Sequence, residues 1–300
     1  MELRHLRYFR VVAEELNLTR AARRLHMAQP PLTRQINNLE EELGVRLFVR
    51  SPRGLAFTPA GQFFHEHTLQ ILDKLEATVA ATRRLARSKR QLFGVGFVPS
   101  VFYGQLPRLV RELRQKDDVE LTLAELTTVQ QIQALKAGRI DMGFGRLRID
   151  DEEVEQEVLF EEPMMVALPA GHPLDGKTPS LSELAEFPLI IYPAKPRPSL
   201  ADMMLGLFRR RGLKVRVSQE ANELQTALGL VVSGLGITLV PEQVSQLTRR
   251  GIVYSYLADT NITCPILCSR RKGEAPTEVM LAANAILDIL VENRRSGRYP

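Results

Sequence analysis

A pair of helices joined by a tight turn is predicted over residues 18–43, which read LTRAARRLHMAQPPLTRQINNLEEEL. Thr19 can cap the first helix, which carries small apolar residues on one side and arginines mostly on the other. Pro30 and Pro31 suit the first turn of the second helix, where a missing N–H costs nothing. The buried face of the second helix is predicted from apolar residues at steps of three and four, namely Leu32, Ile36, Leu39 and Leu43.

The exposed side chains of this pair suit the major groove of DNA. A helix that begins with Gln, Thr and Arg can enter the groove with its first turn against base edges. Arginine pairs with two acceptors of guanine, glutamine pairs with adenine, and the N–H groups at a helix start bind phosphate. We therefore predict a helix-turn-helix. The alternative is a pair of amphipathic helices in an ordinary small bundle, with a solvated polar face.

The basic residues are concentrated near the N-terminus. Residues 1–90 contain 16 Lys/Arg and 9 Asp/Glu, whereas residues 91–300 contain 24 Lys/Arg and 26 Asp/Glu. The net charge of +5 therefore divides into +7 and −2. This distribution is expected of a nucleic-acid-binding domain joined to a module that need not contact nucleic acid.

Two further elements complete the predicted N-terminal domain, residues 1–60. Apolar residues from Leu3 to Val12 predict a helix that closes a three-helix core. Residues 45–61 predict two short strands around a Pro-Arg-Gly turn, which together form a wing. Arg50 and Arg53 at its bend can reach phosphate or the minor groove; the alternative is an exposed hairpin with solvated arginines.

A long helix is predicted from Phe63 to about Lys89, because this stretch contains no Gly or Pro. Its apolar stripe needs a partner surface, and the same helix of a second copy is the economical partner. We therefore assign residues 61–90 to a dimerisation linker helix and hinge. His65 and His67 point to different faces, so we expect no metal there. The stripe consists of Phe64, Ile71, Leu75, Val79 and Thr82.

Beyond residue 91, apolar strands alternate with helices, which predicts parallel, doubly wound α/β structure. The first set has strands at 91–98, 119–126 and 139–145, with helices at 101–116 and 129–138. The second set has strands at 163–169, 188–193, 215–219 and 237–241, with helices near 199–211, 223–233 and 241–249. A strand at 263–270 and a helix at 276–294 close the chain. Two α/β halves joined by crossing strands are typical of the periplasmic-binding-protein type, which closes on a ligand by hinge motion.

Three predicted strands of the first set end in polar residues that suit an anion. They lead to Ser100, Thr128 and Arg146, and ligands of open α/β sheets bind beyond the carboxyl ends of the strands. Hydroxyls beside helix N-termini, with an arginine nearby, form a carboxylate receptor. The alternative is that the two hydroxyls cap their helices and Arg146 makes a surface ion pair.

The motif AARRLHMAQPPLTRQINNLEEELGVRLFVR, the opening MELRHLRYF and the later FTPAG closely resemble the N-terminal domain of LysR-type transcriptional regulators. The segments GFVPS, ALKAGRIDMGFGRLRI and ALGLVVSGLGITLVP resemble the members that control catechol and benzoate catabolism in response to cis,cis-muconate. This resemblance covers essentially the whole chain. It implies an α plus α/β fold: a winged helix-turn-helix, a linker helix, and an effector-binding domain at 91–300 with two α/β subdomains of periplasmic-binding-protein type. Subdomain I comprises 91–162 and 268–300, and subdomain II comprises 163–267.

The resemblance also implies the site residues. Expected DNA-binding residues are Thr19, Arg20, Gln29, Pro30, Pro31, Thr33, Arg34, Gln35, Arg50 and Arg53. Expected effector-binding residues are Ser100, Val101, Thr128, Arg146, Leu200 and Ile266. Leu200 stands where the benzoate-responsive member has Phe, and Phe160 stands where it has an Arg that serves a second, benzoate site. A regulator that responds to muconate alone is therefore expected. The implied partners are promoter DNA, the effector, further copies in a homodimer or homotetramer, and RNA polymerase for an activator.

Other classes of protein fit less well. Gly94 and Gly96 lack the third glycine of a dinucleotide fingerprint, and we find no serine elbow, zinc cluster or P-loop, so we expect neither an enzyme nor a cofactor. A purely architectural DNA binder leaves two hundred residues of α/β sequence unexplained. An α/β enzyme or a solute-binding protein for a small dicarboxylate remains the alternative, against which stand the basic N-terminus and the missing export signal. Cys264 and Cys268 suggest a reduced, cytoplasmic setting.

Overall fold

The computed structural model describes residues 1–51, 54–87, 90–246 and 248–296. The chain divides into two compact units, Met1–Arg83 and Arg84–Pro300, which are described separately below. Within the described ranges, no helix is both long and apolar enough to span a bilayer.

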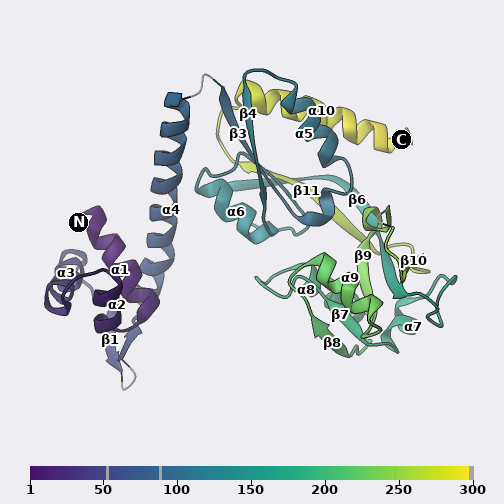
Figure 1. The fold of residues 1–300 in the computed structure, drawn as a ribbon, viewed down its shortest axis with the longest axis horizontal. Coiled ribbons are helices and arrows are strands. Elements are labelled where there is room, and N and C mark those ends of the chain that lie inside the picture. Colours follow the sequence, from purple (N-terminus) through teal and green to yellow (C-terminus); the bar gives the residue numbers. More distant parts are fainter. Residues whose placement is uncertain (52–53, 88–89, 247, 297–300) are drawn as a thin grey trace. The chain divides into compact units, whose positions relative to one another are not determined.

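The first unit is a three-helix domain with a β-hairpin and most of a long helix (Figure 1). Its elements are α1 (Leu3–Glu15), α2 (Leu18–Arg24), α3 (Gln29–Leu43), β1 (Phe48–Ser51), β2 (Gly54–Phe57) and α4 (Pro59–Arg87). Phe9, Leu32 and Leu39 are fully buried in the core between the helices. This burial confirms the inward face predicted for the second helix of the pair.

Three details of this unit differ from the sequence prediction. Asn17, not Thr19, caps α2: its side chain accepts hydrogen bonds from the N–H groups of Thr19 and Arg20. The helix α4 begins at Pro59, four residues earlier than predicted. Phe64 of the predicted dimer stripe packs against Phe9 of the same unit, with ring centroids 5.0 Å apart, whereas Ile71 and Val79 are exposed.

The second unit contains the remaining elements. Its strands are β3 (Gln91–Phe97), β4 (Val119–Glu125), β5 (Met142–Gly145), β6 (Val154–Pro169), β7 (Leu189–Ile191), β8 (Val217–Glu220), β9 (Thr238–Pro241), β10 (Ile252–Tyr256) and β11 (Thr263–Arg271). Its helices are α5 (Leu106–Arg114), α6 (Thr128–Lys136), α7 (Leu181–Ala185), α8 (Leu200–Arg210), α9 (Leu224–Val232) and α10 (Glu278–Arg295), with 3₁₀ turns η1 (Pro99–Val101) and η2 (Glu242–Gln246).

Two hydrophobic cores divide the second unit into two lobes. Lobe I is the part around β3, β4 and β5, with α5 and α10 packed together on one face of the sheet and α6 on the other (Figure 1). Lobe II is the part around β7, β8 and β9, with α8 and α9. The long strand β6 belongs to both lobes: its first half pairs with β11, and its second half pairs with β9 and β10.

The sheet of lobe I is mixed, which corrects the prediction of a wholly parallel arrangement. β3 pairs in parallel with β4 and β5, as predicted, but β11 lies antiparallel between β5 and β6. The sheet continues into lobe II in the strand order β10-β6-β11-β5-β3-β4, and β9 pairs with β6 off this path. The predicted helix at 241–249 is a short 3₁₀ turn instead, and β10 was not predicted. The crossing strands between two α/β halves are confirmed.

Candidate effector pocket and DNA-binding surface

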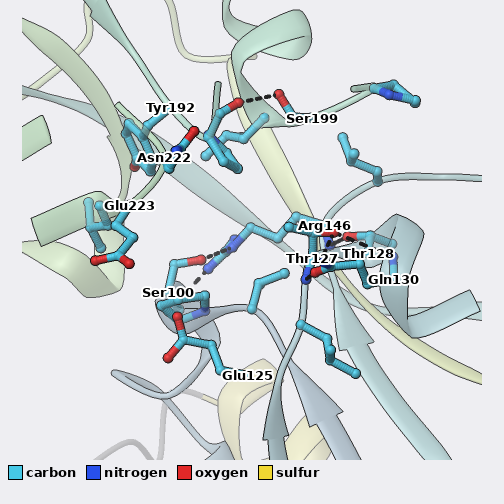
Figure 2. Close-up of a pocket in the computed structure, with 18 residues that line it drawn as sticks. Ser100, Glu125, Thr127, Thr128, Gln130, Arg146, Tyr192, Ser199, Asn222 and Glu223 are labelled. Carbon is cyan, nitrogen blue, oxygen red and sulfur yellow. Dashed lines mark hydrogen bonds between the residues drawn. The ribbon is translucent and has the colours of Figure 1, made fainter. Parts of the chain in front are cut away.

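The carboxyl ends of β3, β4 and β5 bring three polar residues to one place. Ser100 lies in η1 directly after β3, Thr128 is the first residue of α6 after β4, and Arg146 follows β5. Because these strands are parallel neighbours, their ends lie at the same edge of the sheet. All three side chains are at least nine-tenths buried. Figure 2 shows Ser100, Thr128 and Arg146 close together on one wall of a pocket.

Arg146 is fixed by hydrogen bonds from three directions. Its Nε donates to Ser100 Oγ at 2.7 Å, and its backbone N–H donates to Thr128 Oγ1 at 3.1 Å. Its Nη2 donates to Glu162 Oε2 at 2.7 Å, and Glu162 is fully buried. Nη1 is buried and has no hydrogen-bond partner among the described residues. Burial disfavours the charged guanidinium, but the neighbouring Cys264 and Glu162 side chains together more than offset this, so the pKa of Arg146 lies above its ordinary value.

Gly145 allows the contact between Thr128 and Arg146. A Cβ at residue 145 would lie 2.7 Å from Thr128 Oγ1, which is closer than real side chains approach. Thr127 caps α6 by accepting a hydrogen bond from the N–H of Gln130, so the Thr128 hydroxyl is not used as the cap. The hydroxyl therefore faces Arg146 instead of its own helix.

The opposite wall of the pocket comes from lobe II. It includes Tyr192 after β7, and Asn222 and Glu223 before α9 (Figure 2). Leu200 at the start of α8 also lines it. The Tyr192 hydroxyl is buried without a hydrogen-bond partner in the described part of the chain, and burial raises the pKa of Tyr192 well above its usual value, so the hydroxyl stays neutral. The pocket between the two walls has a volume of about 150 Å³.

The structure brings together four of the six predicted effector-binding residues and separates two. Ser100, Thr128, Arg146 and Leu200 line this pocket. Val101 and Ile266 line a different, smaller apolar cavity beside Phe160, on the α10 side of the sheet. The guanidinium carbon of Arg294 lies over the Phe160 ring, 4.2 Å from the ring centroid. The structure therefore does not place Val101 and Ile266 beside Arg146, and their role in effector binding stays a prediction.

Sequence reasoning missed the lobe II residues Tyr192, Asn222 and Glu223. β7 and β8 are parallel, and Tyr192 and Asn222 follow their carboxyl ends, so the rule used for lobe I also applies here. The signal was weak because β7 and β8 are only three and four residues long. It also missed Glu162, whose partners come from segments distant in the sequence.

In the first unit, the predicted base-contacting residues share one exposed edge of α3. Gln29, Pro30, Pro31 and Arg34 are exposed, and Thr33 and Gln35 are half-buried. Gln29 Nε2 donates to Thr33 Oγ1 at 3.2 Å. Thr19 and Arg20 are exposed on α2, although Arg20 Nε also donates to Glu15 Oε2 at 3.2 Å. Arg50 lies in β1, and Arg53 lies outside the described residues.

A buried glutamate joins this helix to the hairpin. Glu40 of α3 accepts hydrogen bonds from the N–H groups of Leu47 and Phe48 at 2.8 and 3.1 Å, and Arg46 Nη1 donates to it at 2.7 Å. The carboxylate thus fixes the direction in which the chain leaves α3 and enters β1.

Comparison with known proteins agrees with this division of the chain. Residues 3–62 match the family described as bacterial regulatory helix-turn-helix protein, lysR family. Residues 86–295 match the LysR substrate binding domain. The two matched segments together cover almost all of the sequence.

Several curated relatives and solved structures extend over nearly the whole chain. The transcriptional regulator CatR of Pseudomonas putida is 53% identical over 274 residues, covering 91% of this chain and 94% of CatR. BenM of Acinetobacter baylyi is 40% identical over 283 residues, covering 93% of each chain. Full-length CbnR has a TM-score of 0.69 at 30% identity, covering 97% of this chain and 99% of CbnR, and it has also been solved with its target DNA. These matches confirm the resemblance and the predicted fold class: the chain belongs to the LysR family of bacterial helix-turn-helix transcriptional regulators.

Proposed function

We propose that this regulator activates genes of catechol or benzoate degradation when a small dicarboxylate, cis,cis-muconate or a close analogue, binds between its two lobes. The observation that carries the proposal is the buried arginine Arg146, held by Ser100 and Thr128 at the edge of the lobe I sheet. An arginine beside two hydroxyls and a helix N-terminus is a carboxylate receptor.

Lobe II offers a second position for a carboxylate. Leu200 is the first residue of α8, and the N-terminus of this helix faces the pocket. Ser199 caps the next N–H group, that of Ala201. A molecule with carboxylates at both ends can therefore bind Arg146 in lobe I and the start of α8 in lobe II. A cavity of about 150 Å³ holds a group as large as benzene, which matches the six carbons of the diacid, and its carboxylate oxygens would lie against the polar residues of the two walls.

A second effector site for benzoate is not part of this proposal. A solved structure describes benzoate as the effector of BenM's effector-binding domain. In this chain the cavity beside Phe160 has a lining made almost entirely of apolar side chains, so it offers a poor receptor for a carboxylate. A response to the diacid alone is the form of control that this lining supports.

The DNA-binding role rests on the N-terminal unit. Gln29, Thr33 and Arg34 at the start of α3 would contact base edges, with Pro30 and Pro31 shaping the helix start. The exposed apolar residues of α4, including Ile71 and Val79, would pair with α4 of a second copy. The working form would be a cytoplasmic homodimer or homotetramer that binds a two-part operator on double-stranded promoter DNA and contacts RNA polymerase.

Effector titration of the full chain tests this function. Muconate at 100 times its Kd stabilises a protein by about 2.7 kcal/mol, which corresponds to a Tm increase of several degrees for a unit of this size. Adipate, which has the same charges without the double bonds, and benzoate serve as comparison ligands. A shift with muconate that exceeds the shift with benzoate supports the proposal. Equal, negligible shifts with every acid would refute it.

A further inference from the structure

The two lobes share a contact beside the pocket, in addition to the crossing strands. Tyr103 lies in the lobe I segment between η1 and α5, yet its ring packs against the hydrophobic core of lobe II. Its hydroxyl accepts a hydrogen bond from Gln225 Nε2 of α9 at 3.0 Å. Arg249 Nη1 donates to the backbone oxygen of Gln225 at 3.1 Å, which helps to hold this residue in place.

The next residue, Gly104, extends this contact to η2. A Cβ at residue 104 would lie 1.9 Å from Gln243 Oε1, so a larger residue would force the buried Gln243 amide to move. The backbone N–H of Gln243 donates to Glu162 Oε1 at 2.6 Å. Residues 103–104 therefore touch lobe II at both α9 and η2.

The same short segment carries Ser100 of the pocket. Hydrogen bonds from the N–H groups of Val101, Phe102 and Gly104 to the carbonyls three residues earlier make residues 98–104 a continuous tight turn. Ser100 and Tyr103 are thus connected by a backbone with little freedom to flex. A displacement of one moves the other.

The partner of Tyr103 also belongs to a pocket wall. Gln225 is the second residue of α9, and the three residues before it, Asn222, Glu223 and Leu224, line the pocket. The hydrogen bond from Gln225 to Tyr103 therefore joins the wall that contains Ser100 to the wall that precedes α9. A ligand that touches both walls binds to the arrangement that this hydrogen bond maintains.

We propose that Tyr103 is a positioning residue for the effector: it holds the Ser100 turn of lobe I against α9 of lobe II, so that effector affinity depends on the angle between the lobes. This inference rests on the proposed effector pocket. Without the hydrogen bond, fewer molecules have both pocket walls in place at one time, and the apparent Kd rises in proportion.

A double-mutant cycle on the full chain tests this role. Tyr103→Phe keeps the ring and removes the hydroxyl, and Gln225→Ala removes the donor. From the net free energy of one hydrogen bond, we expect the Kd for cis,cis-muconate to be about 2- to 10-fold higher in each single variant. The double variant should bind no more weakly than Gln225→Ala alone, because both changes remove the Tyr103–Gln225 hydrogen bond and only Gln225→Ala also removes the bond from Arg249 Nη1 to Gln225 Oε1. Tyr256→Phe is the matched control, since its hydroxyl donates to Glu242 within lobe II at 2.6 Å.

Hydrogen exchange without effector separates this role from the effector assignment. We expect faster exchange over residues 99–105 and 222–228 in Tyr103→Phe and unchanged exchange there in Tyr256→Phe. An unchanged Kd together with unchanged exchange in Tyr103→Phe would overturn the inference, as would single-variant effects on Kd that multiply in the double variant. If the wild type binds no muconate, the effector proposal fails, and the exchange result still decides whether Tyr103 joins the lobes.

Discussion

Removing Arg146 should affect stability and effector binding together, and the structure allows the two effects to be separated. Arg146→Ala leaves the fully buried carboxylate of Glu162 without its cation. Breaking a buried ion pair in this way costs about 3–5 kcal/mol. For a unit of this size each kcal/mol lowers Tm by about 2–4 °C, so we expect Tm to fall by about 6–20 °C.

The double variant Arg146→Met with Glu162→Gln isolates the binding effect. Methionine fills the space of the arginine stem, and glutamine can still accept the hydrogen bond from the backbone N–H of Gln243. Because no charge is left unpaired, Tm should return close to the wild-type value. The affinity of the double variant for muconate should be about 10- to 150-fold lower than that of the wild type, because a hydrogen bond to a charged group contributes this factor.

Differential scanning fluorimetry and isothermal titration calorimetry on the full chain measure these two quantities. Operator binding, followed by gel shift, should survive in the double variant, because the DNA-binding residues lie in the other unit. Wild-type muconate affinity in the double variant would show that Arg146 does not bind the effector. An unchanged Tm in Arg146→Ala would show that the Arg146–Glu162 pair is not as interdependent as its burial indicates.

Four further outcomes are expected. Arg34→Ala should weaken operator binding by about 1–3 kcal/mol and relax its sequence preference, and an unchanged ratio of operator to random-DNA affinity in a gel shift would contradict the base contact. Ile71→Asp should lower the oligomeric state seen by light scattering, because it places a charge in the apolar stripe of α4, where Ile71 is 48% exposed. Burial of Asp202 opposes its ionisation, but a hydrogen bond from the Ser199 N–H and the ion pair with Arg197 hold its pKa below the usual value. A carboxylate whose pKa is lower in the folded than in the unfolded state stabilises the protein above its unfolded pKa, and this stabilisation is lost as pH falls through the folded pKa. We therefore expect Tm to fall more steeply below pH 4 (about the ordinary Asp value) in the wild type than in Asp202→Asn. Burial raises the pKa of Cys268 to about 12 and also raises the pKa of Cys264, so a thiol reagent at about pH 8 should react with neither cysteine before unfolding.

The local patterns of the sequence predicted much of the fold. The spacing of Leu32, Ile36 and Leu39 indicated the buried face of α3, and these residues are buried. The alternation after residue 91 indicated β3, β4 and β5 with α6 between two of them. These elements are decided by periodicity and by residues that start and stop helices, which are local properties.

Contacts between distant segments were not predictable in the same way. The antiparallel position of β11 between β5 and β6 depends on chain topology, because an apolar strand reads alike in either direction. Val101 and Ser100 are neighbours in the sequence, but the 3₁₀ turn sends their side chains to different cavities. Glu162 reads as one more charge in an acidic stretch, and only the fold brings Arg146 and the N–H of Gln243 to it.

The position of β11 in the sheet affects how the chain folds during its synthesis. Residues 263–271 lie between β5 and β6, so both strands have an open edge until this late segment has been synthesised. Open edges are templates for pairing with other chains. A gene truncated so that its product ends before residue 263 should therefore yield insoluble protein, even though the DNA-binding unit is complete. A genetic screen should recover such truncations as loss-of-function alleles, not as partly active regulators.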